Sequence, residues 1–95
     1  MSIPSTATAF AGTTASLSNV EFEIKTIQDQ IFALTQEAQQ AVGDQELLQK
    51  YHEQGTALEQ QLKQLEMEYG ALKTRLEGEE KMRKESVERG FKLNI

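Results

Sequence analysis

Apolar residues recur along most of this chain at alternating steps of three and four, which is the seven-residue repeat of a coiled coil. In the first half the repeat runs through Val20, Ile24, Ile27, Ile31, Leu34, Ala38 and Ala41. In the second half it runs through Leu48, Tyr51, Leu58, Leu62, Leu65, Tyr69, Leu72 and Leu76. Side chains at this spacing form one stripe along a helix, here called the seam, which a single helix cannot bury. The pattern therefore predicts association between helices rather than a catalytic pocket.

Composition limits the chain to one small helical unit. Its 95 residues, 38% of them hydrophobic, are too few and too polar for a compact enzyme core. The regular pattern argues equally against disorder throughout. The absence of cysteine excludes disulfides, thiolate nucleophiles and soft metal sites. We predict an all-α fold whose stability comes from a hairpin, an oligomer or a partner.

Charge and hydropathy bear on partners and location. The net charge of −5 argues against a surface that binds nucleic acid. Bases gather in residues 81–92, but four glutamates between Glu79 and Glu88 interleave with them, as on a solvated face. No apolar run approaches the roughly 20 residues needed to span a bilayer. Residues 1–15 lack the features of a cleaved secretory signal, so we expect an intracellular protein or a component of a virion or similar assembly.

The start of the chain has the composition of a separate arm. Residues 1–17 carry no charge and are rich in serine, threonine and alanine. We expect an extended segment that docks on a partner, because it has too few apolar residues to fold alone. Ile3, Phe10 and Leu17 are seven residues apart, so extra turns of helix are the alternative, which Pro4 weakens.

The first coiled-coil helix is predicted over residues 18–43. Residues 18–21 read Ser-Asn-Val-Glu, a capping box in which the Ser18 and Glu21 side chains each accept the other's backbone N–H. Gly43 suits the left-handed conformation that ends a helix. The repeat also slips by three residues at Gly43-Asp44, which favours a chain reversal there. One long helix with a local break is the alternative.

A second, longer helix is predicted over residues 44–89, followed by a tail at 90–95. Gly55 falls on the seam of this helix, where it would let a facing side chain approach closely. Toward the end of the helix the seam weakens, because Glu79 and Arg83 occupy core positions. The tail alternates apolar and polar residues, which is typical of extended chain.

Residues with catalytic or metal-binding chemistry form no constellation. His52 is the only histidine, and no second strong ligand lies one helical turn from it. The carboxylates occupy flank positions of a helix, with no cleft to tune them for acid–base work. We therefore expect no enzyme activity, no cofactor and no metal.

Four phenylalanines are candidate contacts with a partner. Phe22 and Phe32 fall outside the seam of the first helix, while Phe10 and Phe91 lie in the arm and the tail. Exposed aromatic side chains often mark a contact surface. Packing inside a multi-helix bundle is the alternative for Phe22 and Phe32.

These patterns together predict an extended arm followed by a two-helix hairpin that forms an oligomeric coiled coil. Isoleucine at both core positions of the seven-residue repeat in the first helix favours coiled coils of three or more helices when the helices are parallel. We expect a non-enzymatic structural subunit that builds or bridges a larger assembly, such as a virion or a secreted filament, with copies of itself and other proteins as partners. The alternative is a soluble adaptor or small helical chaperone for one partner protein. A nucleic-acid accessory protein that uses the basic stretch is the third class.

Overall fold

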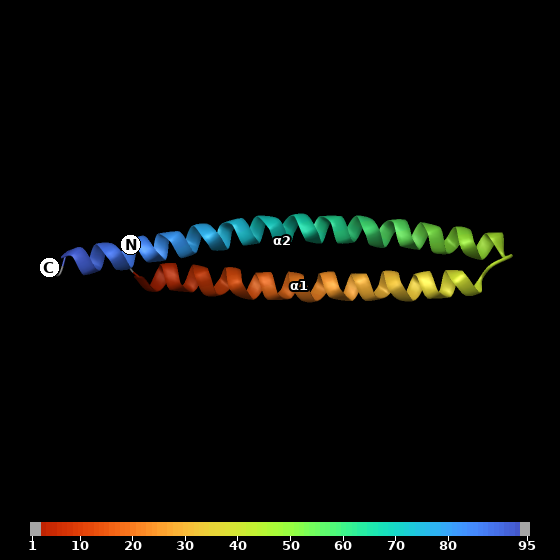
Figure 1. Cartoon of the computed structure of the whole chain (residues 1–95), viewed down its shortest axis with the longest axis horizontal. Coiled ribbons are helices and arrows are strands. Elements are labelled where there is room, and N and C mark those ends of the chain that lie inside the picture. The colour runs from red at the N-terminus through yellow and green to blue at the C-terminus, as the bar shows by residue number, and fades with distance from the viewer. Residues whose placement is uncertain (1–2, 94–95) are drawn as a thin grey trace.

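The computed structural model is a hairpin of two long helices that lie side by side (Figure 1). Helix α1 spans Ile3–Gln40 and helix α2 spans Gln45–Leu93. The structure describes the backbone of residues 3–93 and the side chains of residues 8–90. The molecule measures 77 × 16 × 14 Å, and no strand occurs in the described backbone. The all-α fold and the helical hairpin are therefore confirmed.

The chain reverses at residues 41–44, where the repeat slips. Gly43 has a φ of 99°, in the left-handed region that favours glycine. Asp44 then caps α2, because its side-chain Oδ1 accepts the backbone N–H of Leu47 at 3.1 Å. The alternative of one long helix with a local break is wrong.

Helix α1 begins fifteen residues before the predicted start, so the extended arm is wrong for residues 3–17. Thr13 and Leu17 are buried against α2, and with Phe10 they continue the steps of three and four backward from Val20. Long-range burial therefore outweighs the polar composition of this segment. Residues 1–2 lie outside the described backbone.

Neither Pro4 nor the capping sequence at residues 18–21 interrupts this helix. Pro4 stands in the first turn of α1, where its missing N–H would have had no intrahelical partner in any case. The predicted capping box at residues 18–21 lies inside α1, so the predicted helix start at Ser18 is wrong. Ser18 and Glu21 are both exposed there. A capping sequence alone does not begin a helix where the preceding residues also have a stripe to bury.

Helix α2 continues to Leu93, so the predicted end at residue 89 and the extended tail are wrong for residues 90–93. The segment before this point is rich in Glu, Lys and Arg, which are strong helix formers, and it contains no proline. Because α2 has 49 residues and α1 has 38, the C-terminal end of α2 projects past the start of α1 (Figure 1). Residues 94–95 lie outside the described backbone.

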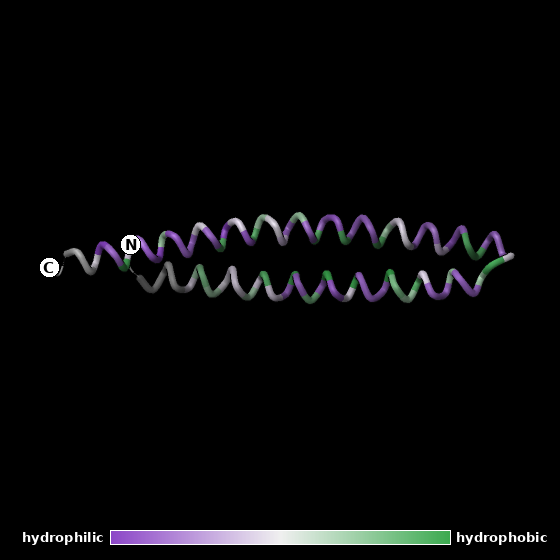
Figure 2. Tube along the Cα trace, viewed as in Figure 1, coloured by the Kyte–Doolittle hydropathy of each residue, from purple (hydrophilic) through white to green (hydrophobic). Residues whose placement is uncertain are grey.

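The seam lies between the two helices, where apolar residues recur on the facing sides (Figure 2). Every predicted seam residue from Val20 to Leu76 is buried or half-buried. Among them only Val20 and Ala41 are buried, at 5% and 8% exposure, and the others are half-buried. One partner helix therefore covers one side of each stripe and leaves the other side open.

Spin labels at Asp29 and Gln60 will report the reversal in solution. Both residues are exposed. Because Leu34 lies opposite Gly55, Asp29 and Gln60, each five residues further from the turn, lie at a similar level of the two antiparallel helices. We expect a short interspin distance, since packed helix axes are about 8–10 Å apart. A continuous helix would place the two residues roughly 46 Å apart at 1.5 Å per residue. Pulsed dipolar spectroscopy on labelled chains diluted with unlabelled protein makes the measurement within one chain, and a long distance would contradict the hairpin.

Candidate interaction surface

A polar contact crosses the seam near the end of the hairpin away from the turn. Thr13 Oγ1 lies 2.8 Å from Glu79 Oε1 and 3.1 Å from the carbonyl oxygen of Ala9, so its one proton is shared between two acceptors. Arg75 Nε donates to the same Glu79 oxygen at 3.0 Å. The Glu79 side chain is 13% exposed and Thr13 is 4% exposed. The carboxylate is therefore bound on one oxygen, while its Oε2 is buried without a hydrogen-bond partner among the described residues.

Arg83 also finds a partner in α1. Its guanidinium lies 5.1 Å from the centre of the Phe10 ring, in the range of a cation–π contact. Glu79 and Arg83, which made the seam of α2 look weak, thus stand opposite Thr13 and Phe10. The missed signal was the spacing of Phe10, Thr13 and Leu17, which extends the repeat of α1. The structure places Phe10, a predicted partner contact, against a residue of its own chain.

Gly55 faces Leu34 at the middle of the seam. A Cβ atom built on Gly55 would lie 3.6 Å from Leu34 Cδ2, which is ordinary van der Waals contact. The two helices are thus in register at this layer, with room for one methyl group. The position on the seam is as the repeat predicts, but the approach is not so close that only glycine fits.

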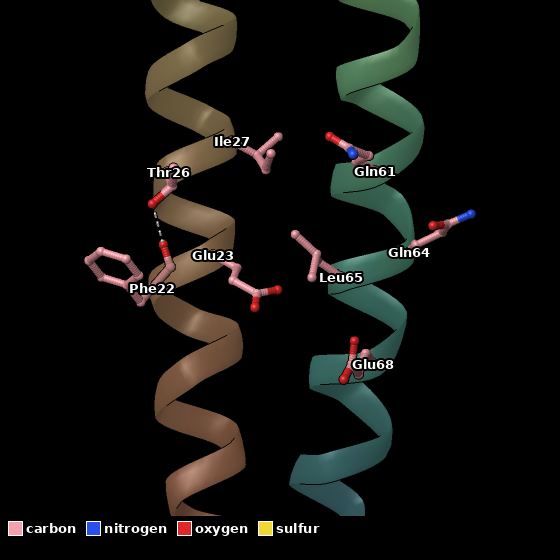
Figure 3. Close-up of a pocket in the computed structure, with 8 residues that line it drawn as sticks. All are labelled: Phe22, Glu23, Thr26, Ile27, Gln61, Gln64, Leu65 and Glu68. Carbon is pink, nitrogen blue, oxygen red and sulfur yellow. Dashed lines mark hydrogen bonds between the residues drawn. The ribbon is translucent and has the colours of Figure 1, made fainter.

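A shallow groove of about 400 Å³ runs along one side of the seam. Four residues of α1 and four of α2 line it: Phe22, Glu23, Thr26 and Ile27, and Gln61, Gln64, Leu65 and Glu68. Ile27 and Leu65 point toward one another between the helices, and the Glu23 carboxylate turns toward α2 (Figure 3). Among the described side chains, neither Glu23 nor Glu68 makes an ion pair. The groove therefore has an apolar floor and two unpaired carboxylates at its edge.

The outer face of α1 carries two exposed aromatic side chains. Phe22 is 72% exposed and Phe32 is 66% exposed, so neither packs in the core of the hairpin. The Phe22 ring points away from α2 (Figure 3). Phe91 lies in α2, but its side chain is outside the described residues. Phe22 and Phe32 thus present apolar surface that the hairpin leaves uncovered.

Side chains of the types that bind metal ions are scattered over the described parts of both helices. No group of three or more His, Cys, Asp or Glu side chains there is placed to hold a metal ion. His52 is exposed, and its backbone carbonyl accepts the Thr56 hydroxyl at 3.0 Å, an ordinary helix contact. Neither described helix has an apolar stretch long enough to cross a membrane.

Comparisons with known proteins give this chain no family. No protein-family model matches it, and it has no match among curated proteins or solved structures. Function is therefore to be inferred from the surfaces of the hairpin itself.

Replacing Gly55 with alanine will stabilise the hairpin. The change gains roughly 0.5–1 kcal/mol of helix propensity, and the new methyl group meets Leu34 without a clash. Gly70→Ala is the matched control, because Gly70 lies in the same helix with open space around its would-be Cβ. We expect Gly55→Ala to raise the thermal unfolding midpoint at least as much as the control. A lower midpoint for Gly55→Ala alone would show that something approaches Gly55 more closely than Leu34 does.

Replacing Thr13 with valine will destabilise the hairpin by about 1–3 kcal/mol, because Glu79 Oε1 loses a buried hydrogen-bond donor. Thr14→Val is the control: Thr14 is exposed and bonds within its own helix, so the cost is below about 0.5 kcal/mol. Combining Thr13→Val with Glu79→Leu makes this layer apolar and recovers most of the loss. Urea unfolding gives the free energy of unfolding of the natural chain and of these three variants. Equal effects of the two threonine changes would show that the Thr13–Glu79 contact does not form in solution.

Proposed function

We propose that this chain is a non-enzymatic structural subunit that builds or bridges a larger protein assembly by packing its half-open seam against further helices. The observation that carries the proposal is the incomplete burial of the seam. Residues such as Leu62 and Leu65 keep part of their apolar surface in solvent although α2 already packs on α1. A third or fourth helix would bury the remaining side of the stripe.

The total surface of the hairpin supports the same proposal. Its accessible surface is 7641 Å², whereas a compact monomer of the same 10.7 kDa mass exposes about 5,500 Å². The excess of roughly 2,000 Å² is as large as the surface that a stable protein–protein interface buries in total. Association would thus supply the burial that the elongated hairpin lacks.

The expectation that more than two helices pack together rests on the half-exposed seam and not on the isoleucines of α1. Isoleucine at both core positions favours three or more helices only when the helices run parallel, and the two helices of the hairpin are antiparallel. The half-exposed seam is independent of that rule. An elongated rod of 77 Å with an open apolar side suits repetitive packing, as in a filament or a virion layer.

Exposed Phe22 and Phe32 favour a second candidate, an adaptor or small chaperone that binds one different protein. Such a protein would bury these rings in a heterologous contact and would not need copies of itself. The two candidates differ in what the isolated chain does. A structural subunit associates with itself, whereas an adaptor stays monomeric until its partner is present.

Sedimentation equilibrium at micromolar concentration tests the proposed function. We expect a species heavier than the 10.7 kDa monomer, with helicity that rises with concentration. Leu62→Ala is expected to weaken association by about 2–4 kcal/mol, as for other buried leucines. Gln60→Ala is the control on the exposed face two residues away, with an effect below about 0.5 kcal/mol. A stable helical monomer at all concentrations would overturn self-assembly and favour the adaptor.

A further inference from the structure

Charge is unequally divided between the C-terminal end of α2 and the rest of the chain. Residues 81–93, here called the basic end, hold five bases and two acids, a net charge of +3. The remaining residues hold five bases and thirteen acids, a net charge of −8. The hairpin preserves this difference, because it places the basic end near the start of α1, which has no acidic residue before Glu21.

The basic end presents an apolar side chain beside a cation. Val87 is 63% exposed and forms a shallow depression with Arg83, Lys84 and Glu88. Arg83 is engaged with the Phe10 ring. Lys84 makes no ion pair among the described side chains. An uncovered valine thus lies one helical turn from an unpaired ammonium group.

The groove offers the complementary arrangement. Its apolar floor is made by Ile27 and Leu65, and its carboxylates, Glu23 and Glu68, are unpaired among the described side chains. Two carboxylates line the same groove, so a cation docked there is attracted to both. A helix that carries an apolar side chain next to a lysine fits such a groove.

We propose that the basic end of one copy docks in the groove of a second copy, with Val87 on the apolar floor and Lys84 beside Glu23 and Glu68. The contact cannot form within one chain. Val87 and Leu65 lie on the same continuous helix, 22 residues and therefore roughly 33 Å apart. This inference rests on the proposed function and gives it a specific contact between subunits, in which copies overlap along part of their 77 Å length.

Intermolecular disulfide trapping tests this contact, and the natural chain has no cysteine to interfere. A chain carrying Val87→Cys is mixed with a mass-tagged chain carrying Gln61→Cys, which lies in the groove lining. The control is Gln60→Cys, the neighbouring exposed residue outside the groove. We expect a disulfide-linked heterodimer with the Gln61 variant in clear excess over the control. Equal yields from both variants would overturn the proposal.

Charge reversal supplies a second, independent readout. Lys84→Glu on the Val87→Cys chain, or Glu68→Lys on the Gln61→Cys chain, is expected to lower the heterodimer yield roughly two- to fivefold. Combining the two reversals restores the yield, and added salt lowers that of the natural pair. Circular dichroism checks that each variant keeps its helicity. If no reversal changes the yield, the charge pairing is wrong.

Sedimentation equilibrium on the same samples separates the two proposals. If the chain self-associates but Gln61→Cys and Gln60→Cys link equally to Val87→Cys, this contact is wrong and the proposed assembly function stands. If the chain is a monomer at every concentration, self-assembly itself is wrong, and this contact fails with it.

Discussion

The burial of one apolar stripe against one other stripe is the constraint on which this structure depends. Isolated helices gain little stability in water, so α1 and α2 each rely on the seam that they share. The seam extends from Phe10 near the start of α1 to Leu76 and Arg83 near the end of α2. A single partner covers only one side of each stripe, and the seam is accordingly half-buried along most of its length. The stability of the hairpin and the self-association proposed for it therefore depend on the same seam.

The polar layer of Thr13 and Glu79 limits how these stripes align. Apolar layers of a coiled coil tolerate a slide of one heptad, because one layer resembles the next. After such a slide Glu79 would stand in an apolar layer without Thr13, and only Arg75 of its own helix would still bind its carboxylate. The turn at Gly43 limits sliding at the other end. The layer thus helps to set the register between the two helices as well as to stabilise the hairpin.

The hairpin was predictable from sequence, because its signals are local: the period of three and four, and a glycine where the phase slips. The helical start of α1 was not, because its cause lies some 66 residues away in the chain. From their composition, residues 3–17 are predicted to be an arm. Only the knowledge that Glu79 and Arg83 of α2 lie opposite them predicts a helix instead. Glu79 and Arg83 in turn indicate an end of the seam as long as Thr13 and Phe10, which contact them, are assigned to an arm. The groove was equally hidden, since the register between the helices decides that Glu23 and Glu68 line the same groove.

Charged side chains without an ion pair are the ones that could give the proposed contact between copies its specificity. Glutamines occupy many flank positions beside the seam, including Gln28, Gln30, Gln54 and Gln61. Neutral flanks neither attract a correct partner nor repel a wrong one by charge, so they leave the orientation of an added helix unspecified. The groove carboxylates and the basic end are exceptions, with opposite charges at separate levels of the hairpin. A contact between them fixes the offset between two copies, whereas apolar burial alone would allow many offsets. In the proposed assembly the half-open seam would drive copies together, and the placement of these few charges would select how they align.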